Sequence, residues 1–235
     1  MKTVIIAAGM SSRIWNETDN RPKTLLPFAE GTILSTILSN FHQVGVTSFV
    51  IVVGYQSELI KNYLEKNECF GYEISFIENL EWEKGNGISV LAAQPEITDE
   101  VFLLSMSDHI VAPVALRRIT NHKSTKNLLL VDSQTEKIYD INDATKVYCE
   151  GSRIVDIGKN ITQYNGVDCG IFKLKNSFFR AMKEVLEYNQ DSISAAIKVL
   201  IKDMNMKAVF LKAEEKWIDI DTPESYQYSL DFLKP

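Results

Sequence analysis

Continuous runs of apolar residues alternate with helical patterns along the first 110 residues of the chain. An unbroken apolar run is typical of a central parallel strand, and such runs occur at 4–8, 49–53, 74–77 and 101–104. Between them, apolar side chains recur at helical spacing over 32–43, 59–64 and 88–93. This alternation predicts an α/β fold with a doubly wound parallel sheet.

The second half of the chain follows a different pattern. Strands are expected at 128–131, 145–149, 153–157, 167–173, 206–212 and 217–220, and helices at 177–188, 193–202 and 223–232. No linker rich in Pro, Gly or Ser separates the two halves. We therefore expect one domain over residues 1–235, with a mixed, mainly parallel sheet and a small antiparallel addition.

Composition and charge narrow the function classes. Of 235 residues, 45% are hydrophobic and 24% are charged, which is typical of a globular protein. The net charge of -6 gives no general attraction to nucleic acid or anionic lipid, so neither partner is expected. No segment approaches the roughly 20 apolar residues that cross a bilayer, so we expect no membrane insertion. Three widely spaced cysteines without a CxxC pair indicate reduced thiols and a cytoplasmic protein.

The segments that follow the predicted strands are the candidates for chemistry, because ligands bind beyond the carboxyl ends of parallel strands. The first is Ala7-Ala8-Gly9-Met10-Ser11-Ser12-Arg13, and Pro22-Lys23 comes soon after it. Small residues let backbone N–H groups approach an anion closely, and the two cations suit a triphosphate. The loop has neither the Walker A nor the dinucleotide-binding spacing. An ordinary surface turn with solvated basic residues is the open alternative.

Carboxylates follow two other predicted strands. Asp108 comes after the strand at 101–104, and alternation puts Asp219 and Asp221 on one face of the strand at 217–220. Two close carboxylates repel each other unless a cation or protons intervene, so these three residues together indicate a Mg²⁺ site. The alternatives are that Asp108 caps the next turn and that Asp221 caps the helix that Pro223 begins. His109, beside Asp108, is assigned no catalytic role.

Taken together, these elements resemble the nucleotidyltransferases that activate sugar phosphates and related alcohols. The resemblance runs nearly the whole chain and is closest to the CTP:inositol-1-phosphate cytidylyltransferases. Besides the first loop, it rests on Glu83-Lys84-Gly85-Asn86-Gly87-Ile88-Ser89, Met106-Ser107-Asp108-His109, Asp143-Ala144-Thr145-Lys146-Val147, Asp156-Ile157-Gly158-Lys159-Asn160, Val167-Asp168-Cys169-Gly170-Ile171-Phe172 and Asp219-Ile220-Asp221-Thr222-Pro223-Glu224. One departure is Ser11, which stands where the family's Gly-x-Gly-x-Arg loop has its second glycine. A serine fits there only if the backbone dihedral angles suit a residue with a Cβ.

The resemblance implies a Rossmann-like nucleotide-diphospho-sugar transferase fold, with a nucleotide-binding half (1–110) and an acceptor-binding half (111–235). It assigns the triphosphate to Ala8, Gly9, Met10, Ser11, Ser12 and Arg13, and the phosphates around the reacting phosphorus to Lys23. It places the cytosine at Asn86, Gly87 and Ser89. On the acceptor side it assigns the phosphate to Lys159, the hydroxyls to Asp168 and a weaker role to Lys146. Asp108 and Asp221, with Asp219 nearby, would hold the Mg²⁺ cofactor.

The implied reaction is transfer of CMP from CTP to a phosphorylated alcohol similar to inositol 1-phosphate, with release of pyrophosphate. Phosphocholine, a phosphonate or a sugar 1-phosphate stay open as acceptors. A choline cation would need an aromatic cage, for which Trp15, Trp82, Tyr139, Tyr164 and Trp217 are the candidates. A regulatory protein that binds nucleotide without catalysis is the minor alternative. A homo-oligomer is compatible with the sequence, and a single domain leaves no fused partner to consume the product.

Overall fold

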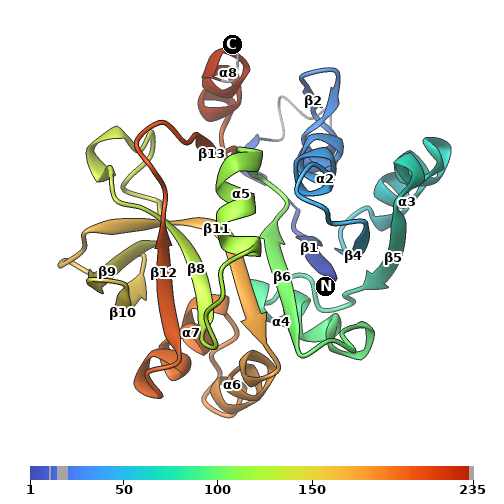
Figure 1. Cartoon of the computed structure of the whole chain (residues 1–235). Helices are drawn as coiled ribbons and strands as arrows, with labels where there is room; N and C mark the ends of the chain where they lie inside the picture. Colours follow the sequence, from blue (N-terminus) through green and yellow to red (C-terminus); the bar gives the residue numbers. More distant parts are fainter. Residues whose placement is uncertain (11, 15–20, 233–235) are drawn as a thin grey trace.

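In the computed structural model, which describes residues 1–10, 12–14 and 21–232, nine strands form one mixed sheet. Ser11 and Trp15 lie outside the described residues. The strand order is β5-β4-β1-β6-β11-β8-β12-β10-β9 (Figure 1). In chain order these strands are β1 (Thr3–Ala7), β4 (Ser48–Val53), β5 (Glu73–Glu78), β6 (Val101–Met106), β8 (Asn127–Asp132), β9 (Lys146–Glu150), β10 (Arg153–Gly158), β11 (Gly166–Lys175) and β12 (Met206–Phe210).

Within this sheet, the strands of the first half of the chain pair in parallel, as predicted. β1 pairs in parallel with both β4 and β6, and β4 pairs in parallel with β5. In the second half, β11 lies between β6 and β8 and is antiparallel to both, while β12 is parallel to β8. The hairpin of β9 and β10 extends the sheet beyond β12. Because β6 and β11 pair directly, the two halves share one sheet, and we propose that residues 1–235 form one domain.

Helices cover both faces of the sheet (Figure 1). One face carries α2 (Ile33–His42), α3 (Ser57–Lys66) and α5 (Pro113–Thr120), and the other carries α4 (Asn86–Ala92), α6 (Ser177–Leu186) and α7 (Ile193–Lys202). Successive side chains of a strand point to opposite faces, so Ile5 and Ile51 enter one core while Val4 and Val50 enter the other. Both faces of β1 and β4 are therefore buried, which explains their uninterrupted apolar sequences.

A short ribbon outside the main sheet builds part of the site. β7 (His109–Val111) pairs antiparallel with β13 (Trp217–Asp219), so that Asp219 lies opposite His109. Just beyond the ribbon, the Ile220 N–H donates to the Asp108 carbonyl at 3.0 Å, and α8 (Pro223–Phe232) follows. Neither β7 nor α5 was predicted from the sequence. A second ribbon joins β2 (Pro27–Phe28) to β3 (Gly31–Thr32).

Two further expectations concern the membrane and the thiols. Within the described ranges, no helix combines the length and apolar character needed to span a bilayer. All three cysteines are free, and Cys149 and Cys169 are buried.

Candidate active site

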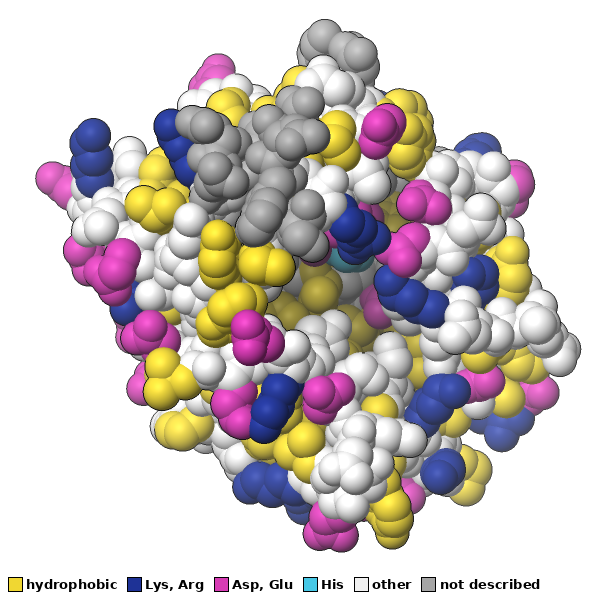
Figure 2. All heavy atoms as spheres, turned by 180° about the vertical axis from the view of Figure 1, so that it is seen from behind, with side chains coloured by type: hydrophobic (Ala, Val, Ile, Leu, Met, Phe, Trp, Pro, Cys, Tyr) yellow, Lys and Arg dark blue, Asp and Glu magenta, His cyan; other side chains and the backbone are white. Residues whose placement is uncertain are grey.

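Two neighbouring cavities open at the carboxyl ends of β1 and β6. The larger cavity has a volume of about 750 Å³ and the smaller one about 170 Å³. Asn86, Met106 and Asp108 line both of them. The face drawn in Figure 2 is hollowed, with acidic and basic side chains around the hollow and hydrophobic side chains within it. Asp108 therefore lies where molecules bound in the two cavities would meet.

The deepest charges form an inner cluster of Lys23, Asp108 and Asp221. Lys23 Nζ donates to Asp108 Oδ2 at 2.8 Å and to Asp221 Oδ1 at 2.6 Å, and the lysine side chain is only 7% exposed. Burial alone would lower the pKa of Lys23, but the Asp108 and Asp221 carboxylates outweigh burial and raise it. Burial would likewise raise the pKa of Asp108, yet Lys23 and His109 lower it. Lys23 and Asp108 are thus both charged at neutral pH.

His109, which was assigned no catalytic role, lines the larger cavity. Its Nδ1 lies 2.7 Å from Asp108 Oδ1, and its ring stacks on Trp217 with centroids 5.7 Å apart. Burial opposes protonation, but the Asp219 and Asp108 carboxylates raise the pKa of His109 to about 10. On the other side the ring meets Gly170, where a Cβ would come within 2.4 Å of it and where φ is +72°. The imidazolium is therefore held in a slot that only glycine leaves open.

Asp219 offers the best sign of a cation site. Its Oδ1 is buried and accepts no hydrogen bond from the described residues, although His109 Nδ1 lies 3.6 Å away. Burial raises the pKa of Asp219, the nearby His109 opposes this, and the Asp108 and Asp221 carboxylates add to it. Ligand atoms of Asp108, His109 and Asp219 lie within 4.8 Å of one another. The two carboxylates are the hard oxygen donors that Mg²⁺ takes, so the donor set fits that ion.

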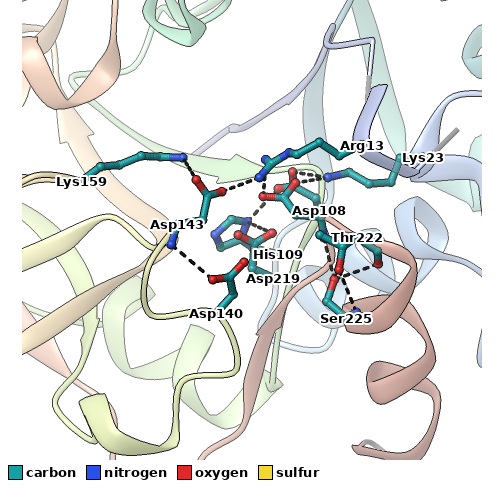
Figure 3. A network of polar contacts seen from close by, with 11 residues as sticks. Arg13, Lys23, Asp108, His109, Asp140, Asp143, Lys159, Asp219, Thr222 and Ser225 are labelled. Atoms are coloured by element: carbon teal, nitrogen blue, oxygen red, sulfur yellow. Dashed lines mark hydrogen bonds and ion pairs between the residues drawn. The ribbon is translucent and has the colours of Figure 1, made fainter.

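Nearer the surface, Asp143 joins two cations into an outer cluster of Asp143, Arg13 and Lys159 (Figure 3). Asp143 Oδ2 accepts from Arg13 Nη1 at 2.5 Å, and Asp143 Oδ1 accepts from Lys159 Nζ at 2.7 Å. Arg13 also donates from Nη2 to Asp221 Oδ2 at 2.7 Å, which connects the outer cluster to the inner one. The sequence analysis quoted the segment that contains Asp143 but gave this residue no role.

Asp168 lines the larger cavity. The pairing of β11 with β8 is irregular between Asp168 and Phe172, and the Gly170 N–H donates to Asp168 Oδ1 at 2.7 Å. Burial raises the pKa of Asp168 to about 6, although the Gly170 hydrogen bond and His109 oppose this. Arg13, Lys159, Asp219 and Asp221 also line this cavity.

Lys146 is placed differently from the expectation. Its Nζ donates to the backbone carbonyl of Lys159 at 2.9 Å and lies 5.8 Å from the centroid of the Tyr164 ring. It lines neither cavity. The lysine therefore braces the segment that carries Lys159.

The smaller cavity brings together the first loop and the start of α4. Ala8, Gly9, Lys23, Asn86 and Ser89 line it, whereas Met10 and Gly87 do not. Gly87 serves packing instead, because a Cβ there would lie 2.6 Å from Met182 Sδ, and its N–H donates to the Asp191 carbonyl. The 3-10 helix η1 (Ser12–Ile14) carries Arg13, and Ser11 lies outside the described residues.

Two further residues of the smaller cavity region were not predicted as nucleotide contacts. Trp82 lines the cavity, and its ring contacts that of Tyr55 with centroids 5.4 Å apart. Asn79 Nδ2 donates to Ser89 Oγ at 3.0 Å, and both side chains are buried. This bond leaves the hydroxyl hydrogen of Ser89 free to donate elsewhere.

The sequence is similar to those of known enzymes. A bifunctional IPC transferase and DIPP synthase from Aquifex aeolicus is 34% identical over 98% of this chain and 51% of its own length. The protein of the same name from Rubrobacter xylanophilus is 28% identical over 97% of this chain and 51% of its own length. The chain thus spans about half the length of these curated relatives.

Solved structures share the whole architecture. The inositol-1-phosphate CTP transferase from T. maritima superposes with a TM-score of 0.86 at 28% identity, over 97% of this chain and 94% of that chain. A UDP-glucose pyrophosphorylase complexed with UDP-glucose has the same fold at 19% identity, with a TM-score of 0.82 over 98% of this chain and 97% of that chain. The family model for nucleotidyl transferases matches residues 2–234. On fold and sequence together, the chain belongs to the nucleotidyl transferase family.

Proposed function

We propose that this nucleotidyltransferase transfers CMP from CTP to inositol 1-phosphate, or to a closely similar phosphorylated polyol, and releases pyrophosphate. The observation that carries the proposal is the position of Asp108, bound to Lys23, at the junction of the two cavities. The T. maritima structure, whose name contains both inositol 1-phosphate and CTP, supports the choice of substrates.

The smaller cavity suits the nucleotide. Gly9 and Lys23 lie at its phosphate end, with an exposed backbone at Gly9 and a buried ammonium at Lys23. Ser89, whose oxygen already accepts from Asn79, has a hydroxyl hydrogen for an acceptor atom of the base. Asn86 lies at the boundary with the larger cavity, where the ribose would pass.

The larger cavity suits a phosphorylated polyol. Lys159 and Arg13 offer N–H donors to its phosphate, and Asp168 accepts hydrogen bonds from its hydroxyls. A phosphate monoester has a second pKa of about 6, so its oxygen is already anionic and needs no general base. The chain's task is to bring two polyanions together, and each pair of unit charges 4 Å apart repels by about 4 kcal/mol at an effective dielectric of 20. Lys23, Arg13 and Lys159 offset that repulsion and orient the attack on the α-phosphorus.

We further propose that Asp108 and Asp219, with Asp221 beside them, hold Mg²⁺. The ion would neutralise charge on the triphosphate when bound. The buried Oδ1 of Asp219, which accepts no hydrogen bond from the part of the chain that the structure describes, supports this assignment. A Mg²⁺ titration tests it: Asp219→Asn should raise the half-saturating Mg²⁺ concentration about tenfold, since one carboxylate ligand is lost. An unchanged Mg²⁺ requirement would remove Asp219 from the metal site.

A choline-type acceptor is not favoured by the aromatic residues. Trp217 lines the larger cavity, but one face of its ring is covered by His109. Trp82 lines the smaller cavity, and Tyr164 lies against Lys146. Among the described candidates Tyr139 remains, and its ring stacks on that of Tyr228 with centroids 5.0 Å apart, whereas a quaternary ammonium needs several ring faces around it.

The test is a matrix of nucleotides and acceptors. CTP, UTP, GTP and ATP are each combined with inositol 1-phosphate, glucose 1-phosphate, phosphocholine and an aminoalkyl phosphonate, and pyrophosphate release is measured with Mg²⁺ present. We expect CTP with inositol 1-phosphate to give the highest kcat/KM. A higher value for another acceptor would replace inositol 1-phosphate in the proposal. CTP binding without pyrophosphate release for any acceptor would indicate the regulatory alternative.

A further inference from the structure

Asp143 occupies an unusual place among the charges of the site. It lies in the segment between β8 and β9, which also places Ile138, Tyr139 and Thr145 along the larger cavity. Its two carboxylate oxygens are divided between two cations, with Arg13 on Oδ2 and Lys159 on Oδ1. These cations come from distant parts of the chain, since Arg13 belongs to the first loop and Lys159 follows β10.

The backbone around Asp143 is fixed by local bonds. The Asp143 N–H donates to Asp140 Oδ1 at 3.3 Å, and the Ala144 N–H donates to the Asp140 carbonyl at 3.1 Å. Lys146 Nζ reaches the carbonyls of both Asn142 and Lys159, which ties the Asp143 segment to the segment that carries Lys159. The backbone of Asp143 is therefore held by contacts that do not involve the Arg13 and Lys159 side chains.

The exposure of the outer cluster argues against a role in stability. The side chains of Arg13, Asp143 and Lys159 are 50%, 38% and 53% exposed. Ion pairs this accessible to water contribute little to folding. Burial would raise the pKa of Asp143, but Lys159 and Arg13 lower it, so the carboxylate stays charged at neutral pH. What remains is an effect on where the two cations lie.

We propose that Asp143 is a positioning residue that holds Arg13 and Lys159 together at the mouth of the larger cavity. Without its charge, the two cations would repel each other. Asp143 uses one N–H of each, and a guanidinium has five donors while an ammonium has three, so donors remain for an incoming phosphate. A phosphate monoester would thus enter between two cations that are already converged. This inference rests on the proposed function, in which both cations contact phosphate.

The test compares Asp143→Asn with the wild-type full-length chain. We expect kcat/KM for inositol 1-phosphate to fall about tenfold, mainly through KM, because two exposed charge pairs are lost. Asp143→Glu should recover part of the loss, since it keeps the charge. The matched control is Asp156→Asn, whose carboxylate pairs with Lys198 at 3.2 Å on the same half of the fold and should leave kinetics unchanged.

A double-mutant cycle separates positioning from a general structural effect. In a Lys159→Met background, Asp143→Asn should cost less than about twofold, because its main partner on the acceptor side is gone. An equal cost in both backgrounds, or unchanged or improved kcat/KM in the single variant, would overturn the inference. Thermal unfolding of each variant checks that the fold is retained.

A binding measurement keeps this test independent of the proposed reaction. Calorimetric titration with inositol 1-phosphate, and with inorganic phosphate if the first does not bind, should show about tenfold weaker binding to Asp143→Asn. Absence of turnover in the wild type with every acceptor would refute the proposed function alone. Equal affinity of the wild type and Asp143→Asn would refute the role of Asp143 alone.

Discussion

The inner and outer clusters use the same chemistry in opposite surroundings. In the inner cluster, Lys23 is almost fully buried between Asp108 and Asp221. In the outer cluster, Asp143 lies between Arg13 and Lys159, and all three side chains are about half exposed. A charge taken out of water must be compensated in place, whereas one that water still solvates can exchange partners at little cost. Fold and function therefore depend on the same residues in the inner cluster and separate in the outer one.

The largest effect should come from removing the inner cation. Lys23→Met leaves the partly buried carboxylates of Asp108 and Asp221 without the cation that they share, so we expect a loss of about 3–5 kcal/mol in the free energy of unfolding. Turnover should fall about a hundredfold to a thousandfold, because an oriented charge near the reacting phosphorus is lost. Urea unfolding and single-turnover pyrophosphate release measure the two effects. If the variant were as stable as the wild type, the inner cluster would not differ from the outer one in its effect on stability, because its charges would not need one another to stay folded.

Removing Lys159 from the outer cluster should affect substrate binding but not stability. Lys159→Met should raise KM for the acceptor about tenfold to a hundredfold, because a charged hydrogen bond to phosphate is lost. Its free energy of unfolding should stay within about 0.5 kcal/mol of the wild type. Steady-state kinetics and urea unfolding on the same preparation test both parts. A large loss of stability would show that the outer cluster also supports the fold.

A smaller effect is expected at Gly170, which leaves room for the ring of His109 beside the inner cluster. Gly170→Ala puts a Cβ against the imidazole and requires a left-handed backbone, which should cost about 1–3 kcal/mol of stability. The displaced ring would move Asp108, and turnover should fall about tenfold. Gly151→Ala is the matched control, because its φ is +58° and a Cβ there meets nothing within 4 Å. Gly151→Ala should lose stability but retain turnover. If the two variants were equally active, the space that Gly170 leaves for the His109 ring would not matter for turnover.

The smallest effect should appear as a dependence of stability on pH. Burial raises the pKa of Asp168 to about 6, whereas in the unfolded chain the pKa is about 3.9. The folded state then binds more protons between these values, so this residue makes the wild type less stable as pH rises from about 4 to about 6. Above pH 6 the loss is complete and constant.

Asp168→Asn removes this titration and keeps an oxygen for the Gly170 N–H. The variant should be about 1–3 kcal/mol more stable than the wild type at pH 8 and equally stable near pH 4. It should also bind the acceptor more weakly, because a hydroxyl loses a charged partner. Urea unfolding at the two pH values is the measurement. A difference that does not change with pH would mean that the Asp168 carboxyl titrates normally in the folded state.

Local sequence patterns predicted the parts of the fold that depend on burial. The strands β1, β4 and β6 are apolar on both faces, so their runs stood out and Asp108 could be placed at a ligand-binding edge. β7 could not be found in this way, because it has only three residues and exists by pairing with β13 far along the chain. The prediction also missed α5, although Pro113 at its first turn was a legible signal.

Among the charged residues of the site, too, some could be predicted from local sequence patterns and others could not. Asp108 and Asp221 could be named because they follow predicted strands, and Lys23 because a Pro-Lys pair comes soon after the first loop. Asp143 lies in an irregular segment, and no spacing in the sequence indicates that it meets Arg13, 130 residues away. The sequence analysis likewise gave His109 no role, since its contacts with Trp217 and Gly170 arise only in the folded chain.

The bonds from Asp221 to Lys23 and Arg13 span 198 and 208 residues. During synthesis on the ribosome, Arg13, Lys23 and Asp108 are made long before Asp221, the remaining carboxylate that both cations contact. Until β13 is translated and docks on β7, the early strands can assemble only around an incomplete set of charges. The charges of the inner cluster are consequently complete only after residue 221 has been made, and a nascent chain halted before that residue should form part of the sheet yet turn over no substrate.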